Sequence, residues 1–266
     1  MPVNESRLDV RIEGQPGAIP ARAFLEVLST AIDLLDDLDR AEQPSAKLPG
    51  RWLIAELRNE SATAALRRAG FPESQSPLRL VDGIGQLGQS EGLPPYFSSE
   101  VAEGLVKIGK RVRQEGVSGV SFSVSGADVG SARIEHVSEL VVANARASLE
   151  GVERALGSVS GVLDVINLRR GAHKVSLYDD VTRRAVRCRF PDELFVAMRE
   201  ALGHRVRALG DITRNRRGQI LRVAIERIEL LPGVPVVPSV DELVGIAAWY
   251  TGDQSTEEYL RSVRGA

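Results

Sequence analysis

Residues 174–193 read KVSLYDDVTRRAVRCRFPDE, and this segment sets the architecture of the second half of the chain. Apolar and polar residues alternate over 174–178 and again over 185–190, which predicts two half-buried strands joined by a polar turn. Proline and two acidic residues then stand at 191–193, a combination typical of the first turn of a helix. We therefore expect a β-hairpin that is followed directly by a short helix.

Three further segments complete this part of the chain. Residues 159–167 precede the hairpin, and residues 205–209 and 220–230 follow the helix, each with the pattern of a strand. Three strands, one helix and two strands over about 75 residues resemble the five-stranded Greek-key barrel called the OB-fold. A ferredoxin-like fold agrees less well with a single helix. We expect an OB-like barrel over residues 157–231.

The first 150 residues predict a separate domain. Residues 8–12 alternate as a strand, and apolar residues at steps of three and four from Pro20 to Arg40 predict an amphipathic helix. Further strands are expected at 52–58, 61–67, 78–81, 117–124 and 131–134, and further helices at 98–114 and 137–149. The fold class is therefore α+β: an N-terminal antiparallel sheet with helices on one face over residues 1–150, then the OB-like barrel and a C-terminal helical tail.

The composition excludes several classes of protein. Hydrophobic residues make up 43% of the 266 residues and charged residues 26%, so wholesale disorder is excluded. The single cysteine, Cys188, excludes a disulfide scaffold and a cysteine-based zinc site, and it fits a reducing cytosol. The sequence contains neither an export signal nor a membrane span, so we expect a cytoplasmic protein.

No motif supports an enzymatic function. Residues 83–88 match G-x-G-x-x-G, but residues 89–95 cannot continue a helix, so we interpret the match as part of a loop over 82–95 and not as a nucleotide site. The three histidines fall in separate elements. The aspartates at 36, 37 and 39 are interpreted as a solvated helix end. We expect no catalytic residue, no metal site and no cofactor.

The barrel segment carries a local excess of positive charge. Residues 157–231 contain 15 Arg and Lys against 9 Asp and Glu, a net charge of +6, whereas the whole chain has −2. OB barrels hold single-stranded nucleic acid on their second and third strands, with cations on phosphates and aromatic rings under bases. The outward-facing candidates are Tyr178, Arg187, Arg189, Arg205 and Arg207. A solvated face or a protein-docking face is the alternative explanation.

Residues 232–266 form a proline-rich strap and a tail that is rich in apolar and aromatic residues. A last helix is expected to begin near Ser255, which with Glu258 has the spacing of a capping box. Aromatic and Arg residues are the types that dominate interface energetics. Eight tail residues are candidates for binding a partner: Leu243, Ile246, Trp249, Tyr250, Tyr259, Leu260, Arg261 and Arg264.

The tail also resembles a known kind of segment. Residues 241–246, the turn at 251–253, and residues 255–261 with Arg264 are similar to the toxin-wrapping tail of antitoxins that neutralise PIN-domain ribonucleases. The resemblance covers about 26 residues. It implies that Leu243, Ile246 and Trp249 dock on the toxin and that Arg261 or Arg264 masks its acidic metal site. The chain departs from that family because it contains no ribbon-helix-helix motif.

Three hypotheses follow from the sequence. The first is an antitoxin-like, non-enzymatic protein that neutralises a ribonuclease toxin through residues 240–264. The second is a single-stranded nucleic-acid-binding protein that uses the basic barrel. The third is a structural or interaction protein whose tail staples its own two domains. The formation of homo-oligomers is left open.

Overall fold

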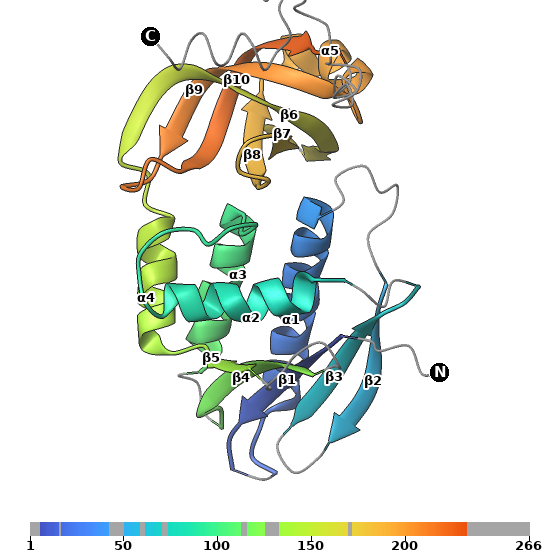
Figure 1. The fold of residues 1–266 in the computed structure, drawn as a ribbon, viewed down its shortest axis with the longest axis vertical. Helices are drawn as coiled ribbons and strands as arrows, with labels where there is room; N and C mark the ends of the chain where they lie inside the picture. Colours follow the sequence, from blue (N-terminus) through green and yellow to red (C-terminus); the bar gives the residue numbers. More distant parts are fainter. Residues whose placement is uncertain are drawn as a thin grey trace, which may run out of the picture. The chain divides into compact units, whose positions relative to one another are not determined.

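The computed structural model describes residues 6–15, 17–42, 51–58, 62–70, 74–112, 116–125, 133–169 and 172–232. The chain divides into two compact units, residues 1–231 and residues 232–266. The first unit contains a sheet covered by helices and a closed barrel, so both expected architectures of the α+β fold are confirmed (Figure 1). The eight candidate tail residues all lie outside the described residues: Leu243, Ile246, Trp249, Tyr250, Tyr259, Leu260, Arg261 and Arg264.

The N-terminal sheet has five strands in the order β2-β3-β1-β4-β5, and all its pairings are antiparallel. The strands are β1 (Arg7–Glu13), β2 (Trp52–Arg58), β3 (Thr63–Arg68), β4 (Gly119–Ser125) and β5 (Arg133–His136). Alternation in β1 buries Leu8, Val10 and Ile12 on one face of the sheet, as the period of two predicts. That face forms the floor of the domain core.

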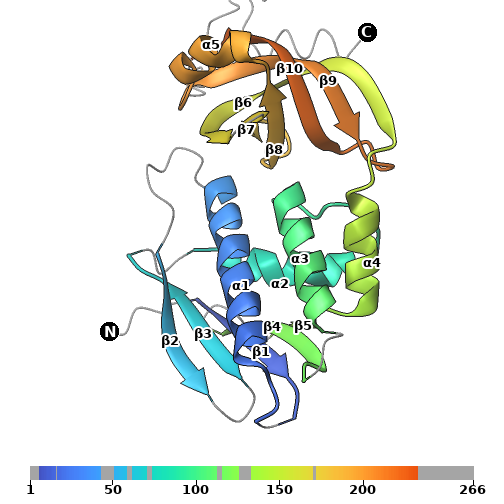
Figure 2. The ribbon, with the colours of Figure 1, turned by 180° about the vertical axis from the view of Figure 1, so that it is seen from behind.

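Helices cover this one face of the sheet (Figure 2). They are α1 (Ala21–Glu42), α2 (Ser76–Leu87), α3 (Ser99–Arg111) and α4 (Glu139–Ser148). Ser98 caps α3 as expected, because its hydroxyl accepts a hydrogen bond from the Val101 amide at 3.2 Å. None of the helices in the described ranges has the length and apolar character that a membrane span requires.

The strand predicted at 78–81 is wrong, and the loop predicted over 82–95 is wrong for residues 82–87, because residues 76–87 form helix α2. The signal for this helix was a proline in its first turn and an apolar stripe in which Leu80, Val81, Ile84 and Leu87 are buried. The glycines obscured that signal because they weaken helices. Gly83 is nevertheless required, since a Cβ there would lie 2.2 Å from the ring of buried Phe97.

Because of this close approach, we expect alanine to have different effects at the two glycines of α2, Gly83 and Gly85. We expect Gly83→Ala to destabilise the protein by about 1–3 kcal/mol, because the added methyl group overpacks the core against Phe97. Gly85→Ala meets only the flexible carboxylate of Glu135, at 2.8 Å, and gains helix propensity. We expect it to be neutral or stabilising by up to about 1 kcal/mol. Thermal unfolding measures both, and equal stabilities would contradict the packing explanation.

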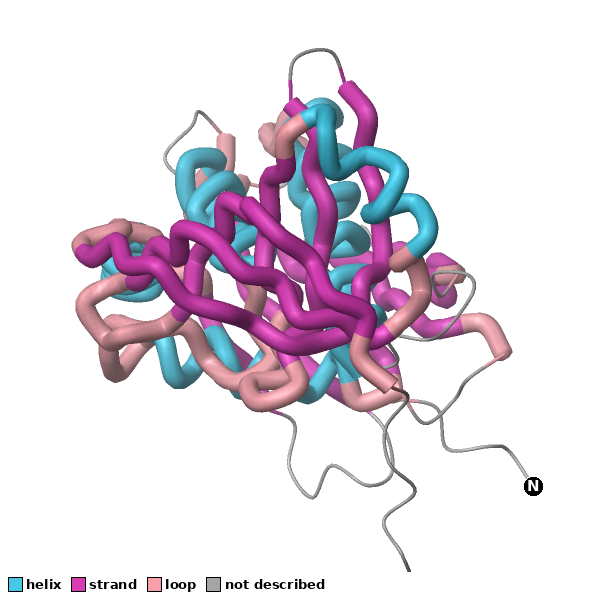
Figure 3. Tube along the Cα trace, turned by 90° about the horizontal axis from the view of Figure 1, so that it is seen from above, coloured by secondary structure: helices cyan, strands magenta, loops and turns pink. Residues whose placement is uncertain are grey.

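The barrel is closed, in the order β10-β8-β7-β6-β9 (Figure 3, strands in magenta). Its strands are β6 (Glu153–Arg169), β7 (Ala172–Asp179), β8 (Ala185–Phe190), β9 (Arg205–Arg214) and β10 (Ile220–Leu230). The 3-10 turn η1 (Asp192–Leu194) and helix α5 (Phe195–Glu200) stand between the third and fourth strands. The third and fifth strands, β8 and β10, pair in parallel, and the other pairings are antiparallel. This is the expected OB-like barrel.

The barrel has its own hydrophobic core, separate from that of the N-terminal domain. Val175, Leu177 and Val186 point inward from the hairpin, and Met198 of α5 is fully buried with them. Cys188 also points inward, as the alternation predicted, and burial raises the pKa of its thiol to about 12. A thiol with this pKa is not a nucleophile at neutral pH.

Candidate ligand face of the barrel

The outer surface of β7 and β8 is the part of the barrel on which OB-folds hold their ligands. Cross-strand register places Lys174 opposite Arg189, Ser176 opposite Arg187 and Tyr178 opposite Ala185. Because Val175 and Leu177 point into the core, these pairs stand on the outer surface. We call the surface of Lys174, Ser176, Tyr178, Arg187 and Arg189 the hairpin face.

Arg187, at the centre of the hairpin face, is bound by two carboxylates of the N-terminal domain. Its Nε donates to Glu100 Oε1 at 2.6 Å, and its two terminal nitrogens donate to the two carboxylate oxygens of Glu103 at 3.2 and 3.0 Å. Burial alone lowers the pKa of Arg187, but hydrogen bonds and charge from Glu103 and Glu100 outweigh it and hold this pKa above its ordinary value. Both acids belong to the first two turns of α3.

Tyr178 does not point into solvent, so the expectation of an exposed stacking platform is wrong. The residue is only 4% exposed. Burial is the main cause that raises the pKa of its phenol, and the charge of Asp164 on β6 adds to it. Asp37 of α1 and Glu100 of α3 raise it further. Charges of both the barrel and the N-terminal domain therefore act on Tyr178.

The loop between β9 and β10, a second ligand-binding element of OB-folds, also contacts the N-terminal domain. The Gln219 side chain bonds both backbone groups of Leu93, at 2.8 and 2.9 Å, and Asn215 donates to the Ser148 carbonyl at 2.9 Å. At the start of β10, Leu221 is buried in the core of the N-terminal domain. Both elements that could hold an oligonucleotide are thus engaged within the chain.

The remaining predicted nucleic-acid residues do not converge with Arg187. Arg205 Nε lies 2.7 Å from Asp180 Oδ2, and Arg207 Nη1 lies 3.9 Å from Glu229 Oε2, so both have acidic neighbours on the barrel itself. Arg189 is exposed on the hairpin face. The structure therefore brings together Tyr178, Arg187 and Arg189 through one hairpin and leaves the two β9 arginines on another strand.

Three acidic side chains that the sequence analysis did not assign to any site have pKa values raised by burial. Burial, then the charge of Glu100, raises the pKa of Asp37 to about 7. Burial also raises the pKa of Asp36 on α1 and of Asp164 on β6. Within the described ranges, no three His, Cys, Asp or Glu side chains are grouped so that they could hold a metal ion. Two of these acids, Asp37 and Asp164, act on the phenol of Tyr178 through their charge.

The interpretation of the aspartates at 36, 37 and 39 as a solvated helix end is wrong for Asp39. This residue is buried, with Oδ2 2.8 Å from Arg68 Nε of β3. The periodicity contained a signal for this, because Asp39 follows the buried Leu35 by four residues and so lies on the same helix stripe. The sequence analysis followed the polarity of Asp39 and not its position on the buried stripe of the helix.

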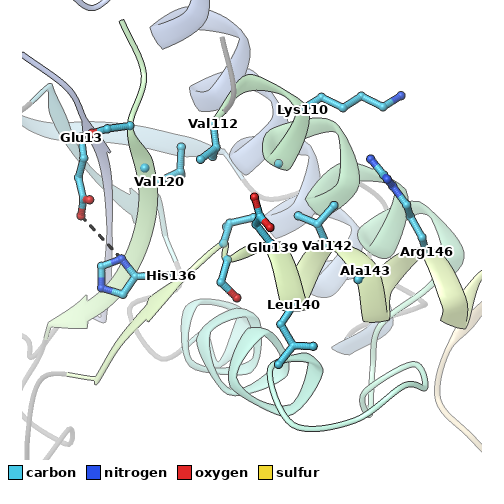
Figure 4. Close-up of a pocket in the computed structure, with 15 residues that line it drawn as sticks. Glu13, Lys110, Val112, Val120, His136, Glu139, Leu140, Val142, Ala143 and Arg146 are labelled. Carbon is cyan, nitrogen blue, oxygen red and sulfur yellow. Dashed lines mark ion pairs between the residues drawn. The ribbon is translucent and has the colours of Figure 1, made fainter. Parts of the chain in front are cut away.

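The N-terminal domain also carries an open pocket of about 960 Å³ between the sheet and helices α3 and α4 (Figure 4). The Nδ1 atom of His136 lies 3.7 Å from Glu13 Oε1 at one side, and Lys110 and Arg146 stand at the other. The His136 side chain is 60% exposed, and 3.7 Å is longer than a hydrogen bond, so nothing fixes the imidazole for proton transfer. We assign no chemistry to this pocket.

No protein family matches the chain, and no curated protein is significantly similar to it. One similar solved structure is "OBody NL8 bound to hen egg-white lysozyme", with 17% identity over 30% of this chain and 98% of that chain, at a TM-score of 0.25. Another is "Crystal structure of S. pombe Stn1-ten1 complex", with 18% identity over 41% of this chain and 72% of that chain, at a TM-score of 0.22. TM-scores this low give no basis for assigning a function.

Proposed function

We propose that this chain is a non-enzymatic interaction protein that binds a second protein through residues 240–264. The observation that carries the proposal is the division of the chain between Leu231 and Pro232, which assigns these residues to a unit of their own. The tail is rich in apolar and aromatic residues, the types that dominate interface energetics, and this composition supports a role in binding a partner.

The specific partner that we propose is a PIN-domain ribonuclease, on the strength of the sequence resemblance of the tail. Leu243, Ile246 and Trp249 dock on that enzyme in this proposal, with Tyr250, Tyr259 and Leu260 extending the contact. Arg261 or Arg264 lies against its acidic metal site, where a guanidinium is complementary to carboxylates. The chain is then an antitoxin-like protein.

Truncation distinguishes this proposal from the third hypothesis, in which the tail staples the two domains of its own chain. We expect deletion of residues 240–266 to change the Tm by less than about 2 °C, because a separate unit adds little to the stability of the first unit. The truncated chain should neither co-purify with nor inhibit a PIN-domain ribonuclease encoded beside its gene. Leu243→Asp should abolish inhibition as well, whereas Glu242→Gln is the matched control that should retain it. A truncated chain that unfolds would instead support the staple.

A second candidate function is single-stranded nucleic-acid binding by the barrel. The observation that favours it is the position of Lys174 and Arg189, which are opposed across the hairpin and exposed. Two adjacent cations on the second and third strands of an OB-like barrel are suited to phosphates. This candidate requires oligonucleotide binding that weakens as salt rises.

A further inference from the structure

The contact between α3 and the hairpin face has the geometry of an arginine holding an anionic ligand. All three nitrogen atoms of the Arg187 guanidinium donate to carboxylate oxygens, and Glu103 takes the two terminal nitrogens together. A phosphate uses the same fork of donors, because guanidinium binds carboxylate and phosphate in the same planar, bidentate manner. Glu100 and Glu103 thus bind all three nitrogen atoms of the Arg187 guanidinium, the central cation of the hairpin face.

We propose that helix α3 is an intramolecular competitor for the hairpin face, in which Glu100 and Glu103 take the place of a single-stranded nucleic acid on Arg187. The inference rests on the second candidate function and adds its regulation. An oligonucleotide then binds strongly only when these two side chains leave Arg187. Oligonucleotide binding and the bonds of Arg187 to Glu100 and Glu103 exclude each other.

The contact is of a kind that a polyanion can displace. The side chains of Arg187, Glu100 and Glu103 retain 33%, 32% and 51% of their exposure, so salt and competing anions reach them. The bonds of Gln219 and Asn215 lie at the β9–β10 loop, and the junction between α4 and β6 spans only residues 149–152. Ser99, the first residue of α3, donates to the Leu221 carbonyl of β10 at 3.3 Å, so α3 stays anchored to the barrel. We infer that the Glu100 and Glu103 side chains alone leave Arg187.

Displacement of the two carboxylates frees the central cation of the hairpin face. Arg187 then joins Lys174 and Arg189, which together give three cations on two adjacent strands for the phosphates of a single-stranded nucleic acid.

The test measures binding of a fluorescein-labelled 15-nucleotide oligothymidylate to the full chain by fluorescence anisotropy. Glu100→Gln with Glu103→Gln removes the charges that compete, and we expect it to bind about tenfold more tightly than the unaltered chain. The matched control, Asp211→Asn with Glu226→Gln, removes two charges from exposed positions on β9 and β10 and should bind as the unaltered chain does. Equal tightening in both would indicate a general charge effect and overturn the proposal.

Hydrogen exchange of the β8 amides supplies a second readout that needs no oligonucleotide. Exchange should be faster in the double glutamine variant and in Arg187→Glu, and unchanged in Arg189→Glu, a matched change two residues away. Adding Arg187→Glu to the double glutamine variant should abolish the gain in affinity. Tight binding by the unaltered chain that depends on Arg187 would overturn the competition and leave the second candidate function standing. Absence of binding in every variant would exclude both.

Discussion

Replacement of Asp39 by alanine is expected to destabilise the N-terminal domain by about 3–5 kcal/mol, a large fraction of the stability of a typical domain. Asp39 Oδ2 lies 2.8 Å from Arg68 Nε, and the two side chains are only 2% and 7% exposed. The hydroxyl groups of Ser74 and Ser76 donate to Asp39 Oδ1 at 2.9 and 2.6 Å. Alanine removes the carboxylate that a buried guanidinium and two buried hydroxyl groups face, and burying a charge without its counter-charge is costly.

Urea unfolding of the variants measures this cost. Asp33→Ala is the matched control, because Asp33 is exposed on the same helix, and it should change the free energy of unfolding by less than about 0.5 kcal/mol. The double variant Asp39→Ala with Arg68→Met should recover part of the loss, since it replaces both charges. A loss below about 1 kcal/mol for Asp39→Ala alone would show that the pair is not what holds β3 against α1.

The fold was largely predictable because it depends on local periodicity. In β8, the alternation of Val186, Cys188 and Phe190 with Arg187 and Arg189 predicted a strand with one buried face, and the buried side chains are those three. The single helix after β8 was predicted from Pro191 and the acids that follow it. Closure of the barrel followed from the order of elements, so it required no knowledge of distant contacts.

Helix α2 was not predicted because its sequence conflicts locally with its structure. Gly83 and Gly85 each lower helix propensity, and the packing that compensates comes from Phe97, which lies in another segment. Periodicity alone could have identified the helix, but glycine was treated as a chain breaker. Tertiary packing decided the outcome.

The environment of the candidate site could not be predicted, for a related reason. The sequence placed Tyr178 and Arg187 on the outer surface of a barrel, and the register confirms that they share that surface. The carboxylates that bind Arg187 come from α3, which precedes Arg187 by more than 80 residues. No pattern within the barrel segment indicates this contact. The excess positive charge of the barrel correctly indicated an acidic partner, but for Arg187 that partner is helix α3 of the same chain.

Asp37 gives the second large expected effect, a stability that depends on pH. Burial, then the charge of Glu100, raises the pKa of Asp37 from 3.8 to about 7 in the folded protein. Because the folded protein holds this proton more tightly than the unfolded chain does, the free energy of unfolding falls as pH rises from about 4 to about 7. Above pH 7 the carboxylate is ionised in both states, and the loss is complete.

Asp37→Asn removes this proton equilibrium while keeping the size of the side chain. We expect the variant to exceed the unaltered chain by about 2 kcal/mol at pH 8 and to match it near pH 4. This is less than the full shift implies, because the side chain is 27% exposed. Asp33→Asn, on the exposed side of α1, is the matched control and should show no such gain. Urea unfolding at pH 4, 6 and 8 measures the difference.

The residual pH dependence of the Asp37→Asn variant is informative too. Asp36 and Asp164 also have raised pKa values because of burial, so the variant should still lose some stability between pH 4 and 7, in the same direction. Asp164 belongs to the barrel and Asp36 to α1, and the charge of Arg40 acts on both. If stability instead rose with pH over this range, burial of Asp37 would not be the controlling cost.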